Sequence, residues 1–359
     1  MKIAILSFPG SPSHGAALQM YSLYCVLSNL GQKVEVINYI PDNVNHKRIK
    51  YVKNLRSIAT NTLSKLFLKN SKPLFIEFEK QIKKFPSNEI TTTEQLSQLS
   101  DRYDRIFVGS DQVWNPVVTG NDFNFYLQFC EDCSKKASYA PSFGVSNVRE
   151  EDREKIASLL SEFSYLSVRE KRGAEIIKEL TGRDAIVVLD PTMLISKQVW
   201  AQEMRPFNFS GGRYVLFYTI KPSPALKIFA QQLANKHGCK LVTVGGRLRE
   251  KFQRDKYPVY AVGPAELIGL IDSAEYVVTN SFHGTAFSVI MQKNFYVEYS
   301  SDTNSRLTNV INMFGLQKCV VGADTLSKEP VQVDYEEVDK VLRFYREKSL
   351  NYLKEAIGE

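Results

Sequence analysis

The chain has 359 residues, of which 43% are hydrophobic and 24% charged, with a formal net charge of +7. This composition is typical of a globular protein in solution, and the length predicts two domains. The five cysteines are an odd, scattered set, which argues against a disulfide framework and for a reducing compartment. The first apolar run stops at Pro9 and is too short for a signal peptide or a membrane span, so we expect a cytoplasmic protein.

Short apolar strands alternate with longer helices from the first residues onward. The expected strands are Lys2–Phe8, Lys33–Tyr39, Arg105–Gly109, Lys136–Ala140, Tyr165–Val168 and Ala185–Leu189, and the expected helices are Gly15–Leu30, Glu150–Phe163 and Lys171–Leu180. This alternation predicts a parallel, doubly wound sheet.

The pattern restarts after the loop Arg205–Gly212. The second series has expected strands at Tyr214–Ile220, Lys240–Val244, Glu275–Thr279 and Phe295–Val297, with helices at Pro222–Lys236, Gly263–Ser273 and Thr285–Gln292. We therefore predict an α/β fold with two Rossmann-like doubly wound domains that face each other across a cleft. The expected domains are 1–200 and 201–334, and the charged tail 335–359 is expected to form a terminal helix packing back on the N-terminal domain.

A basic segment interrupts the first series. Between Asn45 and Phe85 there are eleven Lys or Arg residues and only two acidic residues, with apolar residues interleaved at helical spacing. A basic amphipathic helix suits an anionic lipid surface or an anionic ligand, whereas the alternative is a solvated helical face packed on the body of the domain. No nucleic-acid-binding motif accompanies the segment, so we expect no nucleic-acid partner.

The most informative stretch is Val277–Phe287, in which an apolar strand runs into a histidine and a glycine where a helix is expected to begin. The start of a helix offers unpaired N–H groups and the positive end of a dipole, which suits a phosphate. Gly284 lets a ligand approach the backbone, and His283 can exchange a proton near neutral pH. The alternative is an ordinary capped turn with a histidine at its edge.

Two polar motifs lie after strands of the first domain. In GSDQVWNP at Gly109–Pro116, Asp111 can act as a base or bind hydroxyls, and Trp114 can stack on a sugar face. Gln112 and Asn115 can bind sugar hydroxyls, unless the loop side chains bond to their own backbone instead. Arg169, at the end of a later strand, can clamp a carboxylate or phosphate, and its alternative is a pairing with Glu170.

Ligands of open α/β sheets sit beyond the carboxyl ends of the strands. In the first domain this edge also gathers the loop Pro9–Gly15, whose His14 we assign with Gln112, Trp114 and Asn115 to acceptor binding. In the second domain it gathers Lys221, the segment Gly245–Arg247 and the segment Asn280–Gly284. A cleft between facing sheets would bring both sets to one site.

Taken together, several runs resemble the polysaccharide pyruvyl transferase family. They are GSDQVWNP, SVREKRGAEIIKELTG at Ser167–Gly182, VLDPT at Val188–Thr192, TNSFHGTAFS at Thr279–Ser288 and DTNSRL at Asp302–Leu307. The resemblance implies a two-domain fold like that of GT-B glycosyltransferases. It also implies transfer of pyruvate from phosphoenolpyruvate to two hydroxyls of one sugar, with a cyclic ketal and phosphate as products. The usual setting is synthesis of a surface polysaccharide, sometimes on a lipid-linked sugar, which would give the basic segment a role at the inner face of the membrane.

The resemblance also implies residue roles. His283 matches the family's histidine before glycine, a general acid, and Arg169 matches a donor-binding arginine. Many members have an arginine two residues before that histidine, where this chain has Ser281. Either Arg306, Lys221 or Arg247 therefore supplies the missing cation, or the donor differs.

The chemistry of the donor suits these residue types. Phosphoenolpyruvate carries a carboxylate and a phosphate, which need cationic or N–H-rich groups. We assign them to Arg169, Lys221, Arg247, Ser281, Gly284, Thr285 and Arg306. His283 would protonate the enol methylene, and Asp111 would serve as base for the attacking hydroxyl. No cofactor is required, and we expect no metal, because the CxxC pair Cys130 and Cys133 lacks further ligands.

Two other functions stay open. The first is a GT-B glycosyltransferase that uses a nucleotide sugar. The second is a partner without catalytic activity in a polysaccharide assembly complex, which the missing arginine at Ser281 keeps open.

Overall fold

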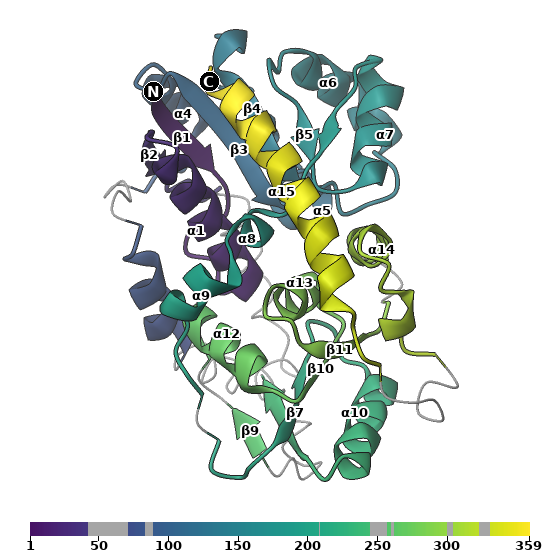
Figure 1. The fold of residues 1–359 in the computed structure, drawn as a ribbon. Helices are drawn as coiled ribbons and strands as arrows, with labels where there is room; N and C mark the ends of the chain where they lie inside the picture. Colours follow the sequence, from purple (N-terminus) through teal and green to yellow (C-terminus); the bar gives the residue numbers. More distant parts are fainter. Residues whose placement is uncertain are drawn as a thin grey trace, which may run out of the picture. The chain divides into compact units, whose positions relative to one another are not determined.

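The computed structural model describes residues 1–41, 71–82, 89–207, 209–244, 257–259, 262–299, 304–322 and 331–359. They form two compact units, each built around its own parallel sheet (Figure 1). Unit 1 contains the described residues within Met1–Tyr51, Glu79–Ile195 and Arg343–Glu359, and unit 2 contains those within Val52–Phe78 and Ser196–Leu342. Residues 71–78 were predicted to lie in the N-terminal domain and instead belong to unit 2.

The main sheet of unit 1 has four parallel strands in the order β2-β1-β3-β4. The strands are β1 (Lys2–Leu6), β2 (Lys33–Val36), β3 (Arg105–Asp111) and β4 (Lys136–Pro141), with a parallel pair β5 (Ser167–Val168) and β6 (Ile186–Val187) beside them. The backbone N–H of Ser138 in β4 donates to the carbonyl of Tyr165, which lies just before β5, at 3.0 Å. β3 and β4 are almost wholly buried, as central strands of a parallel sheet covered on both faces are.

Helices follow most strands of unit 1, as a doubly wound fold requires. They are α1 (His14–Asn29), α4 (Thr93–Ser100), α5 (Pro116–Thr119), α6 (Glu150–Ser161), α7 (Lys171–Thr181) and α8 (Pro191–Leu194), with the 3-10 turns η1 (Phe123–Tyr126) and η2 (Cys133–Lys135). The start of α1 is set by Ser13, whose hydroxyl accepts the N–H of Ala16 at 3.4 Å. α1 packs beside α8, and α6 packs beside α7 (Figure 1).

The sheet of unit 2 has five parallel strands in the order β11-β10-β7-β8-β9. They are β7 (Tyr214–Tyr218), β8 (Lys240–Val244), β9 (Tyr257–Val259), β10 (Tyr276–Thr279) and β11 (Asn294–Val297). The helices are α9 (Lys197–Glu203), α10 (Pro224–Lys236), α12 (Pro264–Ser273), α13 (Phe282–Ile290) and α14 (Asn304–Met313), followed by η3 (Gln317–Cys319) and by the first part of α15 (Tyr335–Ala356). In addition, residues 71–79 are helical.

Each sheet has a point at which the strand order reverses. In unit 1 the chain passes from β1 outward to β2 and then back to β3 on the other side of β1. In unit 2 it passes from β7 outward to β8 and β9 and returns to β10 on the other side of β7. Loops diverge at such a point, and ligands of doubly wound sheets bind there. The loops after β1 and β3, and those after β7 and β10, are therefore the places to look for a site.

The long helix α15 is divided between the two units. From Arg343 onward it belongs to unit 1. The Tyr352 hydroxyl donates to the carbonyl of Ser138 at 2.7 Å, and the Ser349 hydroxyl accepts the N–H of Leu189 at 3.0 Å. These bonds attach the helix to β4 and to the segment that follows β6.

The basic segment predicted between residues 45 and 85 lies largely outside the described residues, which include only 71–82 of it. Its binding to an anionic surface stays a prediction. In the part of the chain that the structure describes, none of the helices combines the length and hydropathy needed to cross a bilayer.

Replacing Tyr352 by Phe is expected to lower the free energy of unfolding by about 1 kcal/mol, because the buried Ser138 carbonyl loses the Tyr352 hydroxyl and keeps only the hydroxyl of Ser167 as a side-chain donor. Urea denaturation followed by tryptophan fluorescence measures this change. Tyr345→Phe, on the same helix and half-buried, is the matched control and should change the stability much less. Equal effects of both changes would contradict the role of the Tyr352 bond.

Candidate functional site

The turn between β10 and α13 carries the His-Gly pair of unit 2. α13 begins at Phe282, three residues before the predicted start, so His283 is the second residue of the helix. Ser281 caps the helix, because its hydroxyl accepts the N–H of Gly284 at 3.3 Å. The N–H of Ser281 donates in turn to the hydroxyl of Thr279 at 3.0 Å. The turn is therefore closed by its own hydrogen bonds.

The predicted phosphate seat at Gly284 and Thr285, with Ser281 as a donor ligand, is wrong. The N–H of Thr285 donates to the carbonyl of Ser281 at 3.0 Å, and its hydroxyl donates to the same carbonyl at 3.1 Å. A Cβ on Gly284 would lie 2.4 Å from the Thr279 hydroxyl oxygen and 3.1 Å from Cδ1 of Tyr218. The glycine thus permits close packing of the helix on the sheet, and the three residues shape the turn.

His283 is largely buried, with 7% of its surface exposed. The ring of Phe282 stands edge-on to it at a centroid distance of 5.0 Å. The guanidinium of Arg306, from the first turn of α14, lies 5.9 Å from the Phe282 ring. Arg306 is one of the three cations expected to replace the arginine that is missing at Ser281. It lies beside Phe282, the residue that precedes His283.

Lys221 lies in the loop after β7, on the other side of the reversal point from β10. The side chain of Asn280 binds this loop, because its amide donates to the carbonyl of Lys221 at 2.9 Å and its oxygen accepts the N–H of Ile220 at 3.0 Å. The loop after β7 is therefore tied to the end of β10. Arg247, the third expected cation, lies outside the described residues.

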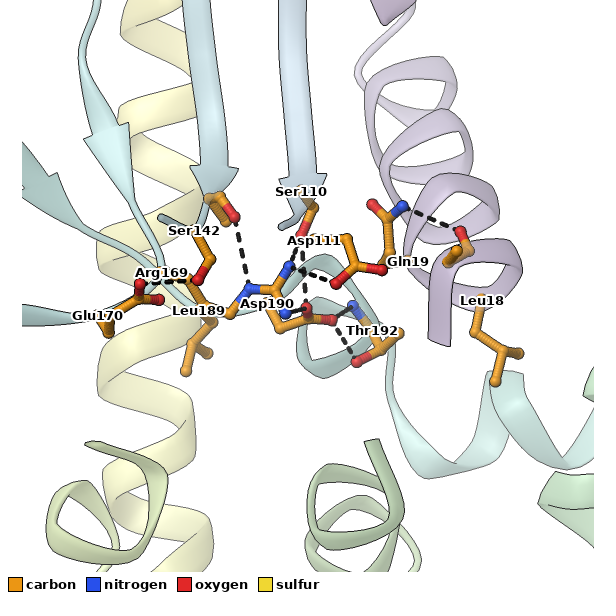
Figure 2. A network of polar contacts seen from close by, with 12 residues as sticks. Leu18, Gln19, Ser110, Asp111, Ser142, Arg169, Glu170, Leu189, Asp190 and Thr192 are labelled. Atoms are coloured by element: carbon orange, nitrogen blue, oxygen red, sulfur yellow. Dashed lines mark hydrogen bonds and ion pairs between the residues drawn. The ribbon is translucent and has the colours of Figure 1, made fainter. Parts of the chain in front are cut away.

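In unit 1, Arg169 does not form an open anion site. Only 3% of it is exposed, and its guanidinium lies 3.3 Å from the carboxylate of Asp190 and 3.9 Å from that of Asp111 (Figure 2). Glu170, the partner expected in the alternative, accepts the hydroxyl of Ser142 at 2.8 Å. The donor-binding role predicted for Arg169 is corrected accordingly: its charge is neutralised inside the unit.

The predicted stacking of Trp114 on a sugar is wrong, because this ring is 1% exposed and lies in the core of unit 1. It stacks on Tyr126 at a centroid distance of 5.4 Å, and its N–H donates to the carbonyl of Phe125 at 2.8 Å. Asn115 is also buried and caps α5, since its side-chain oxygen accepts the N–H of Val117 at 3.0 Å. Its amide donates to Gln112 at 2.7 Å, so Asn115 does not serve as an acceptor ligand.

A cavity of about 300 Å³ lies in unit 1 beyond the ends of β1, β2 and β3. Asp111 and Gln112 are among its lining residues, so the structure brings these two predicted residues together at a cavity. The other lining residues are Phe8, Pro9, Gly10, Ser11, Ser13, Ala16, Tyr39, Ile40, Pro41 and Val118. His14, the first residue of α1, is half-buried and is not part of this lining.

Three residues at this edge were missed by the sequence analysis. Asp190 gives Arg169 its counter-ion and also caps α8, as its carboxylate accepts the N–H of Thr192 at 3.0 Å. Tyr39 lines the cavity and donates to Asp122 at 2.6 Å. Glu79 accepts the N–H of Gly10 at 3.2 Å, and burial raises the pKa of its carboxyl to about 7. The Asp-Pro-Thr run after a strand signals a helix cap at Asp190, but nothing local signals the other two.

Among the described residues, no group of three or more His, Cys, Asp or Glu side chains is arranged to hold a metal ion. Cys130 is buried, whereas Cys133 is exposed.

The model of the polysaccharide pyruvyl transferase family matches residues 14–302, which include Asp111 and Gln112 at the cavity, the Arg169 network and the His283 turn. The chain belongs to the polysaccharide pyruvyl transferase family. A comparison with curated proteins finds no match.

Solved structures similar to this pyruvyl transferase family member show its fold. The UDP-GlcNAc 2-epimerase from Neisseria meningitidis bound to UDP-GlcNAc is 11% identical, with 99% of this chain and 94% of that chain covered and a TM-score of 0.53. The Staphylococcus aureus MnaA–UDP structure is also 11% identical, with 99% and 96% coverage and a TM-score of 0.56. The predicted GT-B-like architecture of two Rossmann-like α/β units is thus confirmed.

Replacing Gly284 by Ala is expected to destabilise the protein by about 1–3 kcal/mol, because the added methyl group overpacks the contact with Thr279 and Tyr218. Gly173→Ala is the matched control. That glycine also lies in a helix, and its added Cβ would come no closer than 3.3 Å to a side chain. Urea denaturation compares the two variants. If Gly284→Ala left the stability unchanged, this result would contradict the packing role and support the prediction that Gly284 lets a ligand approach the backbone.

Glu79→Gln is expected to remove part of the pH dependence of stability. The folded protein binds the Glu79 proton more tightly than the unfolded chain, so this group favours folding most below pH 4.5, and the contribution is lost as the pH rises through about 7. Urea denaturation measures the free energy of unfolding at each pH. As the pH rises from 5 to 8, the free energy of unfolding of the variant should rise by roughly 2 kcal/mol relative to that of the parent protein. Glu77→Gln, an exposed position on the same helix, should leave the profile unchanged; an identical profile for Glu79→Gln would refute the assignment.

Proposed function

We propose that the protein transfers the pyruvyl group of phosphoenolpyruvate onto two hydroxyls of one sugar and forms a cyclic ketal with release of phosphate. The sugar would belong to a surface polysaccharide or to its lipid-linked precursor. Membership of the polysaccharide pyruvyl transferase family supports a transferase that acts on a polysaccharide. The observation that carries the finer proposal is the position of His283, at the start of α13 beside the reversal point of the unit 2 sheet.

The donor would be bound by the cations of unit 2. Phosphoenolpyruvate has a phosphate and a carboxylate, and each needs a positive partner. Arg306 lies beside Phe282, and Lys221 lies in the loop that Asn280 ties to the end of β10. Both therefore belong to the loops and helix starts that surround His283. This arrangement supports Arg306 as the substitute for the arginine that many family members have at position 281.

The reaction would begin with a proton moving from the charged imidazole of His283 to the methylene carbon of the donor. One sugar hydroxyl then bonds to the central carbon and loses its proton. The bond from that carbon to the phosphate oxygen breaks, the phosphate leaves, and the second hydroxyl bonds to the same carbon and loses its proton. One proton is consumed at the methylene and two are released, of which one can stay with the phosphate.

The low exposure of His283 constrains this proposal. Because only 7% of the residue is exposed and its Nε2 atom is buried, the proposal requires an opening through which the donor reaches the ring. General acid catalysis by a positioned side chain typically contributes about 10²–10⁴-fold to a rate. That magnitude sets the expected effect of removing the imidazole.

His283→Ala is expected to slow phosphate release from phosphoenolpyruvate by about 10²–10⁴-fold, with a sugar acceptor present. Phosphate is measured by colorimetry, and mass spectrometry should show a product heavier than the acceptor by pyruvic acid minus one water. His237→Gln is the matched control. This half-buried histidine of unit 2 follows α10 at the opposite edge of the sheet and should leave the rate unchanged.

Full activity of the His283 variant would refute its role as acid. A thermal-shift comparison of phosphoenolpyruvate with UDP-, GDP- and CMP-sugars tests the donor, because a bound ligand stabilises the folded protein. Stabilisation by a nucleotide sugar alone would favour the glycosyltransferase alternative. Binding of no donor would favour a partner without catalytic activity.

A further inference from the structure

Five described non-glycine residues of unit 1 have a positive φ, which residues other than glycine rarely adopt, and three of them lie close together. Ser110, Asp111 and Ala140 have φ values of 24°, 64° and 51°. All three lie at the carboxyl ends of β3 and β4, next to the point at which the strand order reverses. Such conformations are unfavourable and persist only where the surrounding structure holds them. Strain of this kind clusters at functional sites.

One buried side chain contacts all three strained residues. The guanidinium of Arg169 donates to the Ser110 hydroxyl at 2.9 Å and to the carbonyl of Ala140 at 3.4 Å, and it lies 3.9 Å from the Asp111 carboxylate (Figure 2). Its shorter ion pair is with Asp190, at 3.3 Å. Asp190 is therefore the main counter-ion of Arg169. The Arg169 guanidinium thus joins two carboxylates, those of Asp190 and Asp111.

Asp111 lies where the cluster meets the cavity of unit 1. Its side chain is 14% exposed, whereas those of Arg169 and Asp190 are 2% and 0% exposed. The cavity also has Phe8 and Tyr39 in its wall. A carboxylate that accepts hydroxyl hydrogens next to aromatic surface is the combination that sugar sites use. The volume of about 300 Å³ lies at the lower end of the range of small-molecule sites.

We propose that this cavity binds the sugar acceptor, that Asp111 accepts a hydrogen bond from one of its hydroxyls, and that Arg169 and Asp190 position Asp111 for this contact. The acceptor as ligand rests on the proposed function. Arg169 and Asp190 act only through Asp111 and through the strained turn Ser110–Asp111. They are positioning residues, and they do not touch the sugar.

The first test is binding in the absence of phosphoenolpyruvate. The probes are the methyl glycosides of glucose, galactose, mannose and N-acetylglucosamine, and saturation-transfer NMR measures their dissociation constants. At least one probe should bind the full-length protein, and Asp111→Asn should weaken that binding by about 10- to 100-fold, because a hydrogen bond to a charged group is lost. Binding of no probe, or unchanged binding by Asp111→Asn, would overturn the proposal.

The second test addresses positioning. Arg169→Lys keeps the charge near Asp190 but cannot reach several partners with one planar group, so glycoside binding should weaken about tenfold. Because a buried charge left without its partner could unfold the unit, the double variant R169M/D190N removes both charges together. Its binding should weaken as much as that of Asp111→Asn.

Lys136→Met is the matched control for the positioning variants. Lys136 is 1% exposed and pairs with Glu162 at the other end of β4, so its loss perturbs the same unit away from the cavity. The control should leave glycoside binding unchanged. Equal weakening by Lys136→Met and Arg169→Lys would show a general loss of structure and would overturn the positioning role.

A kinetic measurement separates this proposal from the proposed function. In phosphate-release assays, Asp111→Asn and Arg169→Lys should raise KM for the glycoside about tenfold and leave KM for phosphoenolpyruvate unchanged. Normal ketal formation with an unchanged glycoside KM would refute the cavity as acceptor site only. If glycoside binding depended on Asp111 but no phosphate were released from phosphoenolpyruvate, phosphoenolpyruvate would be refuted as the donor and the cavity would stand as the acceptor site.

Discussion

The buried guanidinium of Arg169 holds together the edge of unit 1 at which a ligand can bind. It joins the end of β3 through Ser110, the end of β4 through Ala140, and the start of α8 through Asp190. A buried charge that loses its partner costs about 3–5 kcal/mol, so these three segments cannot shift independently of one another. The ion pair thereby keeps a strained turn in place, and the turn directs Asp111 to the cavity.

Unit 2 fixes the corresponding edge of its sheet with uncharged groups. Ser281 caps α13, Gly284 brings the helix close to Thr279, and Asn280 ties the loop after β7 to the end of β10. Ser281 thus has a structural task at the position where many members of the family have an arginine. The positive charge nearest this turn comes instead from α14, through Arg306 beside Phe282.

The two units therefore offer different chemistry at equivalent places. Both site regions lie at reversal points of parallel sheets, where loops diverge and leave room for ligands. Unit 1 presents a carboxylate and aromatic surface at a cavity, which suits a neutral polyol. Unit 2 has His283 next to Phe282, whose ring lies beside the guanidinium of Arg306, and this cation would suit an anionic donor. A transferase that joins phosphoenolpyruvate to a sugar needs both kinds of surface.

Much of the fold could be predicted from the sequence, because its signals are local. The strand at Lys240–Val244 was predicted with its observed bounds, and the helices beginning at Glu150 and Lys171 start where predicted. Apolar runs of strand length between amphipathic helices require parallel sheets with both faces covered. The short helices α5 and α8 were missed, because four residues carry no periodic pattern and only their capping residues mark them.

The sequence by itself determined the α/β class, the two sheet-centred units and the loops at which polar residues gather. It also placed Asp111 and Gln112 at the carboxyl edge of the sheet, where they line a cavity, because residues that follow parallel strands must collect there. Only the tertiary structure decided which of these polar residues a ligand can reach. Trp114, Asn115 and Arg169 are buried by segments distant in the sequence, such as those that carry Phe125, Phe143 and Asp190. Burial and counter-ions depend on which segments pack together, and no local pattern of residues records that packing.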